Sequence, residues 1–67
     1  MKRTIDEIEN ESGENFEDAI REYLESCIRV GKTDMEECAR WYVRENNLED
    51  GEYNRVLNSL KEALEEL

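Results

Sequence analysis

The stretch from Phe16 to Val30 constrains the fold of this chain more than any other. Its apolar residues recur every three or four positions, which is the period of one face of an α-helix. They are Phe16, Ala19, Ile20, Tyr23, Leu24, Cys27, Ile28 and Val30. At about 100° per residue, these side chains cover roughly half of the helix circumference. A stripe that wide needs more than one packing partner, so we expect this helix to be the central helix of a small bundle.

Two capping boxes, each a threonine followed three positions later by a glutamate, predict the starts of two further helices. The first spans Thr4 to Glu7 and predicts a short helix that carries two isoleucines. The second spans Thr33 to Glu36 and predicts a helix from Asp34 to about Asn46. The main apolar stripe of that helix consists of Met35, Cys38, Ala39 and Tyr42.

A last helix is expected after the turn-like segment that ends at Gly51, with Asp50 as its N-cap. Its apolar stripe is narrower than the others and suits either a helix that lies in the groove between two neighbours or a coiled-coil-like seam. The stripe comprises Tyr53, Val56, Leu57, Leu60, Leu64 and Leu67, with Ala63 at its edge.

The helix boundaries have clear local signals. Asn15 is a favourable N-cap, and Gly31 suits the left-handed residue that ends a helix. The pair Asn46 and Asn47 also suits a helix end, because asparagine tolerates the left-handed conformation. With no proline and three glycines, the chain is predicted to be a single all-α domain over residues 1–67. The expected architecture is a bundle of three main helices plus a short N-terminal helix.

Charge is the second constraint. The chain has 19 acidic residues, nine basic residues and no histidine, for a net charge of −10. Such a field disfavours direct contact with nucleic acid or with an anionic membrane, and it attracts basic protein surfaces. The alternative is that the acids form solvated helix faces and serve only solubility.

Catalytic and metal-binding signatures are missing from the sequence. There is no histidine to act as a base near neutral pH, and Cys27 and Cys38 form no CxxC motif. We expect these cysteines to be free buried thiols, with a disulfide between neighbouring helices as the alternative. No enzymatic activity, metal or cofactor is expected. The N-terminus has no signal peptide and no segment is long enough to span a membrane, so a cytoplasmic protein is expected.

The N-terminal part of the chain carries a run of acids. Seven acidic residues and no basic residue lie between Asp6 and Asp18. Carboxylates spaced along a helix approach the charge density of a nucleic-acid backbone, and tryptophan and tyrosine are common interface anchors. The predicted protein-binding residues are Asp6, Glu7, Glu11, Glu14, Asp18, Glu22, Trp41 and Tyr53. The alternatives are a solvated acidic arm and a tryptophan that merely covers a small core.

In size, charge and predicted helicity, the chain resembles the small acidic proteins with which phages block host enzymes, such as anti-CRISPR and anti-restriction proteins. This resemblance implies a stoichiometric inhibitor that mimics nucleic acid, and it assigns no functional residues. The expected partner is a protein with a basic nucleic-acid-binding surface. The alternative function is a helical adaptor or homodimerisation module that binds through an apolar helix face. Direct DNA binding is opposed by the net charge.

Overall fold

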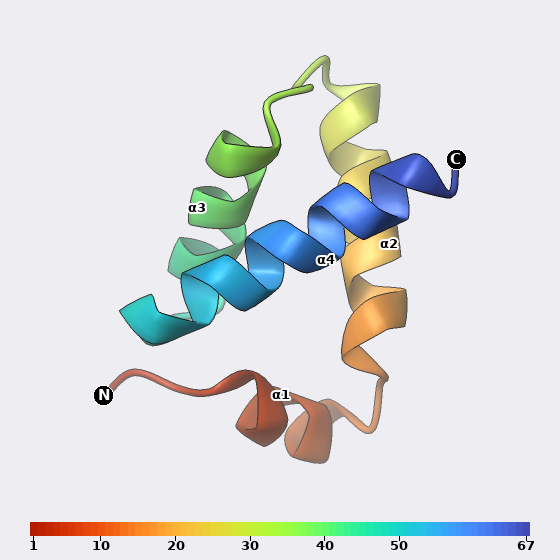
Figure 1. Cartoon of the computed structure of the whole chain (residues 1–67). Helices are drawn as coiled ribbons and strands as arrows, with labels where there is room; N and C mark the ends of the chain where they lie inside the picture. Colours follow the sequence, from red (N-terminus) through yellow and green to blue (C-terminus); the bar gives the residue numbers. More distant parts are fainter.

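The computed structural model describes all 67 residues and consists of α-helices joined by short connections. The helices are α1 (Ile5–Ser12), α2 (Phe16–Arg29), α3 (Met35–Glu45) and α4 (Tyr53–Glu65), and a 3₁₀ turn, η1 (Asp50–Glu52), leads into α4 (Figure 1). The prediction of an all-α bundle with three main helices and a short N-terminal helix is confirmed. None of these helices combines the length and the apolar character needed to cross a membrane.

Helix α4 is the centre of the bundle. It crosses α2 and α3 and packs against both, whereas α2 and α3 contact each other much less (Figure 1). The prediction that α2 would be the central helix is therefore wrong. Helix α2 does pack against more than one helix, as its wide stripe predicts. The C-terminal end of that stripe is not covered, because Ile28 is 40% exposed and Val30 is 70% exposed. Of the two arrangements predicted from the narrow stripe of α4, the structure shows the helix that lies between two others.

The core contains 13 buried residues, and all of them are hydrophobic. Helix α1 supplies only Ile5, and the connection after α3 supplies Leu48. Within α4 the buried residues are Val56, Leu60 and Ala63, which recur at positions i, i+4 and i+7 on one face. Ala63 is thus part of the core, and Leu64, which was expected in the stripe, is 42% exposed.

Most helix ends follow the local signals. The side chain of Asn15 accepts the backbone N–H of Glu17 at 2.8 Å and caps α2. Gly31 ends α2 with φ of 84°, and Asn47 ends α3 with φ of 53°. In each case the next residue donates its N–H to a carbonyl five positions earlier, which is the Schellman arrangement: Lys32 to Cys27 at 2.8 Å and Leu48 to Val43 at 2.9 Å.

Two predicted caps are corrected by the structure. Helix α3 is capped by Asp34 and not by Thr33, because the Asp34 carboxylate accepts the N–H of Glu36 at 3.0 Å. Helix α4 has no side-chain cap, since η1 precedes it and leads the chain directly into the helix. Asp50, the expected cap, forms an ion pair with Lys2 at 3.0 Å instead.

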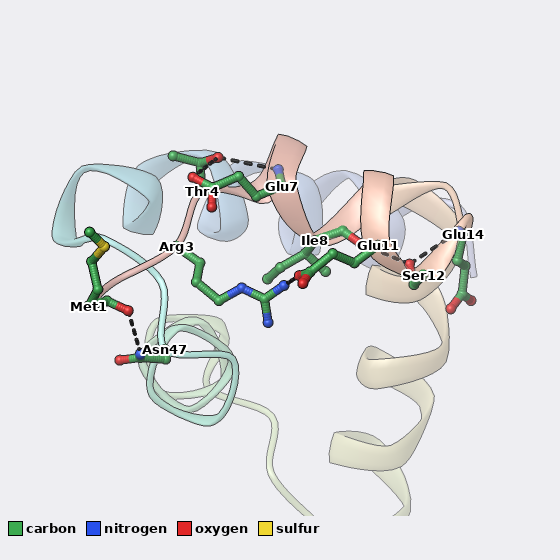
Figure 2. Close-up of polar contacts among 9 residues, drawn as sticks. All are labelled: Met1, Arg3, Thr4, Glu7, Ile8, Glu11, Ser12, Glu14 and Asn47. Carbon is green, nitrogen blue, oxygen red and sulfur yellow. Dashed lines mark hydrogen bonds and ion pairs between the residues drawn. The ribbon is translucent and has the colours of Figure 1, made fainter.

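The N-terminal residues are tied to the connection that follows α3. Arg3 donates its N–H to the Asn47 carbonyl at 2.8 Å and accepts the N–H of Glu49 at 2.9 Å, which forms an isolated β-bridge opposite Leu48. The Asn47 side-chain amide also donates to the Met1 carbonyl at 2.9 Å (Figure 2). These bonds bring the start of the chain beside α3 and fix the direction in which α1 begins.

Candidate protein-binding site

The six predicted acidic binding residues are all exposed, and they lie on α1, on α2 and on the connection between them. Four of the six have a side-chain partner. The pairs are Asp6 with Arg55 (3.7 Å), Glu7 with the hydroxyl of Thr4 (3.2 Å), Glu11 with Arg3, and Asp18 with Arg21 (3.4 Å). Glu14 and Glu22 form no ion pair, so their carboxylates are the ones most available to a partner.

Glu14 and Glu22 line a cleft of about 450 Å³ between α1, α2 and α3. Glu9 from α1 and Glu45 from the end of α3 also line it, which gives four carboxylates, and no lysine or arginine is among the lining residues. We refer to this site as the acidic cleft. It is the place where the structure gathers unneutralised negative charge from three helices and one connection.

The floor of the acidic cleft is aromatic. Phe16, Tyr23 and Tyr42 line it from α2 and α3. The Tyr42 ring packs edge-on against Tyr23, with ring centroids 5.1 Å apart, and against Phe16, with centroids 6.1 Å apart. This edge-to-face packing fixes the orientation of the three rings relative to one another.

The tyrosines report the electrostatic environment of the cleft. Burial, followed by the charge of Glu45, raises the pKa of Tyr23. Burial, followed by the charges of Glu14 and Glu9, raises the pKa of Tyr42. Both phenols therefore stay neutral near neutral pH, and the negative charge of the cleft resides on its carboxylates.

Local hydrogen bonds position the wall between α1 and α2. The Glu9 carboxylate accepts the backbone N–H of Phe16 at 2.7 Å, which joins α1 to the first residue of α2. The Ser12 hydroxyl donates to the Ile8 carbonyl at 3.0 Å and accepts the N–H of Glu14 at 3.2 Å (Figure 2). These bonds hold the connection in place and set the backbone of Glu14 at the rim of the cleft.

This arrangement suits a cationic side chain. A guanidinium group donates several hydrogen bonds to carboxylates and also stacks on aromatic rings. The acidic cleft offers both features, with carboxylates such as Glu14 and Glu22 around a floor that includes Tyr23. An arginine or lysine from a partner protein matches the cleft in charge and in surface character.

The two predicted aromatic anchors lie elsewhere. Trp41 and Tyr53 line a second groove, of about 650 Å³, together with residues of α3 and the N-terminus. Trp41 is 42% exposed, and the ammonium of Lys32 lies 3.8 Å from its ring centroid. Tyr53 is half-buried and its hydroxyl donates to the Glu36 carbonyl at 3.5 Å. The structure therefore does not place these anchors in the cleft that holds Glu14 and Glu22.

Two residues of the cleft, Glu9 and Glu45, are absent from the predicted binding set. Glu9 lies within the N-terminal run of acids, which is the only sequence signal that marks it. Glu45 lies at the end of α3, on the side that the stripe leaves to solvent. Only the packing of α3 against α2 brings it to the cleft, so no local pattern identifies it.

The cysteines form no candidate site. Cys27 and Cys38 are free and buried, as predicted, and burial, together with the neighbouring Cys38, raises the pKa of Cys27 to about 12. A thiol with so high a pKa is a poor nucleophile at neutral pH. No group of three or more histidine, cysteine, aspartate or glutamate residues is arranged to hold a metal ion.

No protein-family model, curated protein or solved structure matches this chain.

Proposed function

We propose that this protein is a small, cytoplasmic, protein-binding inhibitor that covers the basic nucleic-acid-binding surface of another protein. The observation that carries the proposal is the acidic cleft, in which four carboxylates and no base surround an aromatic floor. The inhibitor acts by occupancy and not by catalysis. It is of the same general type as anti-CRISPR and anti-restriction proteins.

The charge outside the cleft supports a basic partner. The net charge of −10 steers a basic protein towards this chain and opposes a nucleic acid. A surface that binds phosphates presents several lysines and arginines at short spacing. The cleft would accommodate one such side chain, and other exposed acids of α1 and α2, such as Glu11 and Asp18, would be available to its neighbours. Their own ion pairs are solvent-exposed and exchange readily for a partner's base.

Competition with nucleic acid tests this proposal. The protein is immobilised and exposed to a nuclease-treated bacterial lysate, and retained proteins are eluted with duplex DNA, with RNA or with salt, then identified by mass spectrometry. We expect nucleic-acid-binding proteins that elute with DNA or RNA, because both ligands occupy the same surface. Retained proteins that resist nucleic acid but elute with salt would contradict the mimic mechanism.

Two matched triple variants locate the binding surface. The first neutralises the cleft through Glu14→Gln, Glu22→Gln and Glu45→Gln, and spares Glu9 because that carboxylate holds the start of α2. The second neutralises three exposed acids away from the cleft through Glu49→Gln, Glu62→Gln and Glu65→Gln. Both have the same net charge, so a loss of capture in the first alone assigns binding to the cleft, and equal losses assign it to the overall field.

A second candidate function is a homodimerisation or adaptor module. It is favoured by large apolar side chains exposed near the ends of α2 and α4, where Val30 is 70% exposed and Leu67 is 72% exposed. This function predicts a dimer that persists in 1 M salt, because apolar contacts are not screened. Light scattering after size-exclusion chromatography distinguishes a dimer from a monomer, and Val30→Ser with Leu67→Ser should dissociate a dimer.

A further inference from the structure

The second groove is lined mainly by basic charged side chains, whereas the molecule as a whole is acidic. It lies between α3, the N-terminal residues and the start of α4, and has a volume of about 650 Å³. Three basic side chains line it, Lys2, Arg40 and Arg44, against a single acid, Asp50. We refer to it as the cationic groove.

Arg40 and Arg44 are free to bind a ligand. Lys2 is already paired with Asp50 at 3.0 Å, whereas neither arginine forms an ion pair. This is notable in a chain with 19 acids and nine bases. Both arginines are exposed and lie four positions apart on α3, so they are neighbours on one face of the helix.

Apolar surface completes the cationic groove. Trp41, Val43, Leu48 and Tyr53 line it beside the arginines. Leu48 is fully buried, while Trp41 is 42% exposed in spite of its size. A ligand that fits this groove therefore combines negative charges with an apolar group.

We propose that the cationic groove binds an extended acidic peptide segment of another protein, in which acidic and aliphatic residues alternate. Residues four apart on a helix are about 6 Å apart along its axis, and alternate residues of an extended chain are about 7 Å apart. Two carboxylates at positions i and i+2 of the peptide therefore match Arg40 and Arg44. The side chains between them point to the other face of the peptide, where the proposal has them contact Tyr53, which lines the groove from the start of α4.

The groove suits a peptide better than a nucleic acid. It has only two unpaired bases, and a nucleic acid would bring its many phosphates against a molecule with a net charge of −10. A short peptide brings two carboxylates and an apolar side chain. The cationic groove shares no residue with the acidic cleft. This proposal therefore goes beyond the proposed function, and its test is independent of that function.

The experiment uses a six-residue peptide of alternating aspartate and leucine, blocked at both ends, and its counterpart with asparagine in place of aspartate. Binding is followed by the fluorescence of Trp41, which is the only tryptophan, and by amide chemical shifts in nuclear magnetic resonance spectra. We expect saturable binding of the acidic peptide with shifts confined to residues around the groove. The asparagine peptide should bind at least about tenfold more weakly, because charge-assisted hydrogen bonds are lost.

Matched double variants test the role of the arginines. Arg40→Gln with Arg44→Gln should weaken peptide binding at least about tenfold. Arg29→Gln with Lys61→Gln removes two unpaired bases outside the groove and should leave the affinity within about twofold. Circular dichroism confirms that both variants are folded.

Several results would overturn the proposal. They are the absence of saturable shifts, shifts outside the groove, equal losses in the two double variants, and equal affinity for the asparagine peptide. Titration with adenosine monophosphate and with a short single-stranded oligonucleotide adds one more. Binding of either ligand in the groove, without binding of the acidic peptide, would assign the site to phosphates and reject the peptide.

Discussion

Helices α4 and α1 are held in this molecule by different kinds of interaction. Helix α4 packs along its length against α2 and α3 and buries Val56, Leu60 and Ala63. Helix α1 buries only Ile5 and has few contacts with the other helices. The two helices therefore represent the apolar and the polar extremes of how this small fold is stabilised.

Polar contacts also hold α1, in addition to the burial of Ile5. The Glu52 carboxylate accepts the N–H of Ile5 at 2.8 Å, and the Glu9 carboxylate accepts the N–H of Phe16. Arg3 forms an ion pair with Glu11, which Figure 2 shows. The ion pair is exposed and is worth at most about 1 kcal/mol, and less in salt. The two bonds to backbone N–H groups are partly buried, and they contribute more.

This difference has a consequence for function. Helix α1 forms one wall of the acidic cleft through Ile8, Glu9 and Ser12. The proposed binding site is therefore built partly on the helix with the fewest buried apolar contacts. Binding surfaces are commonly drawn from the less stable parts of a fold, where a small change in local stability changes the site.

The largest predicted effect comes from truncating a buried apolar side chain of α4. Leu60 is completely buried at the centre of α4, so Leu60→Ala leaves a cavity beneath both neighbouring helices. We expect a loss of about 2–5 kcal/mol in the free energy of unfolding. Much of the stability of so small a domain would be lost, since such domains have only a few kcal/mol in reserve. Urea denaturation followed by circular dichroism measures the change.

The control for this prediction is Leu64→Ala, one position around the same helix from Ala63. Leu64 is 42% exposed, and its truncation should change the free energy of unfolding by less than about 1 kcal/mol. Equal losses in the two variants would show that α4 packs in a different register.

The second prediction is that alkaline pH lowers the free energy of unfolding, because ionisable groups are buried in the apolar core. Burial raises the pKa of Cys27 from 9.0 to about 12 and also raises the pKa of Tyr23 and Tyr42. Above pH 9 the unfolded chain releases a thiol proton that the folded chain retains, so stability is complete below pH 9 and falls as pH rises towards 12. The slope is up to about 1.4 kcal/mol per pH unit for each group.

Urea denaturation at pH 8, 9.5 and 11, in the presence of a reductant, measures this decline. In Cys27→Ala the thiol contribution is missing, so the decline between pH 9 and 11 should be shallower than in the parent protein. An unchanged decline would exclude Cys27 as a source of the alkaline sensitivity.

The boundaries of the helices could be predicted because their signals are local. Asn15 caps α2 and Gly31 ends it, as their conformational preferences predict. The packing order could not be predicted, because it depends on which stripes face each other. Leu48 illustrates this limit: it is a single leucine in a turn, and it becomes fully buried through the Schellman turn that ends α3 and the bridge to Arg3.

The candidate site was predictable to a similar degree. Composition predicts that acids such as Glu14 and Glu22 are exposed, and they are. It does not predict the cleft, because Glu9 and Glu45 come from different helices and meet only through tertiary packing. Composition does not predict the cationic groove either, since acids flank Arg40 and Arg44 in the sequence. In the structure one of these acids, Glu37, pairs with Lys32 and another, Glu45, lines the acidic cleft.

The smallest predicted effect is the most informative about α1. Glu52→Ala removes the acceptor for the N–H of Ile5 and should destabilise the docking of α1 by about 1–2 kcal/mol. Hydrogen exchange should then show faster exchange in α1, with the amides around Leu60 still protected. Glu52→Gln keeps an acceptor oxygen without its charge, so its exchange rates in α1 should lie between those of the parent protein and those of Glu52→Ala. Glu49 is a nearby exposed acid whose side chain makes no cap bond, and Glu49→Ala should have no effect.

Because α1 carries Glu9 to the acidic cleft, Glu52→Ala should also weaken capture of a basic partner, although Glu52 does not line the cleft. Equal acceleration of exchange in α1 and α4 would contradict the idea that α1 opens separately from the bundle.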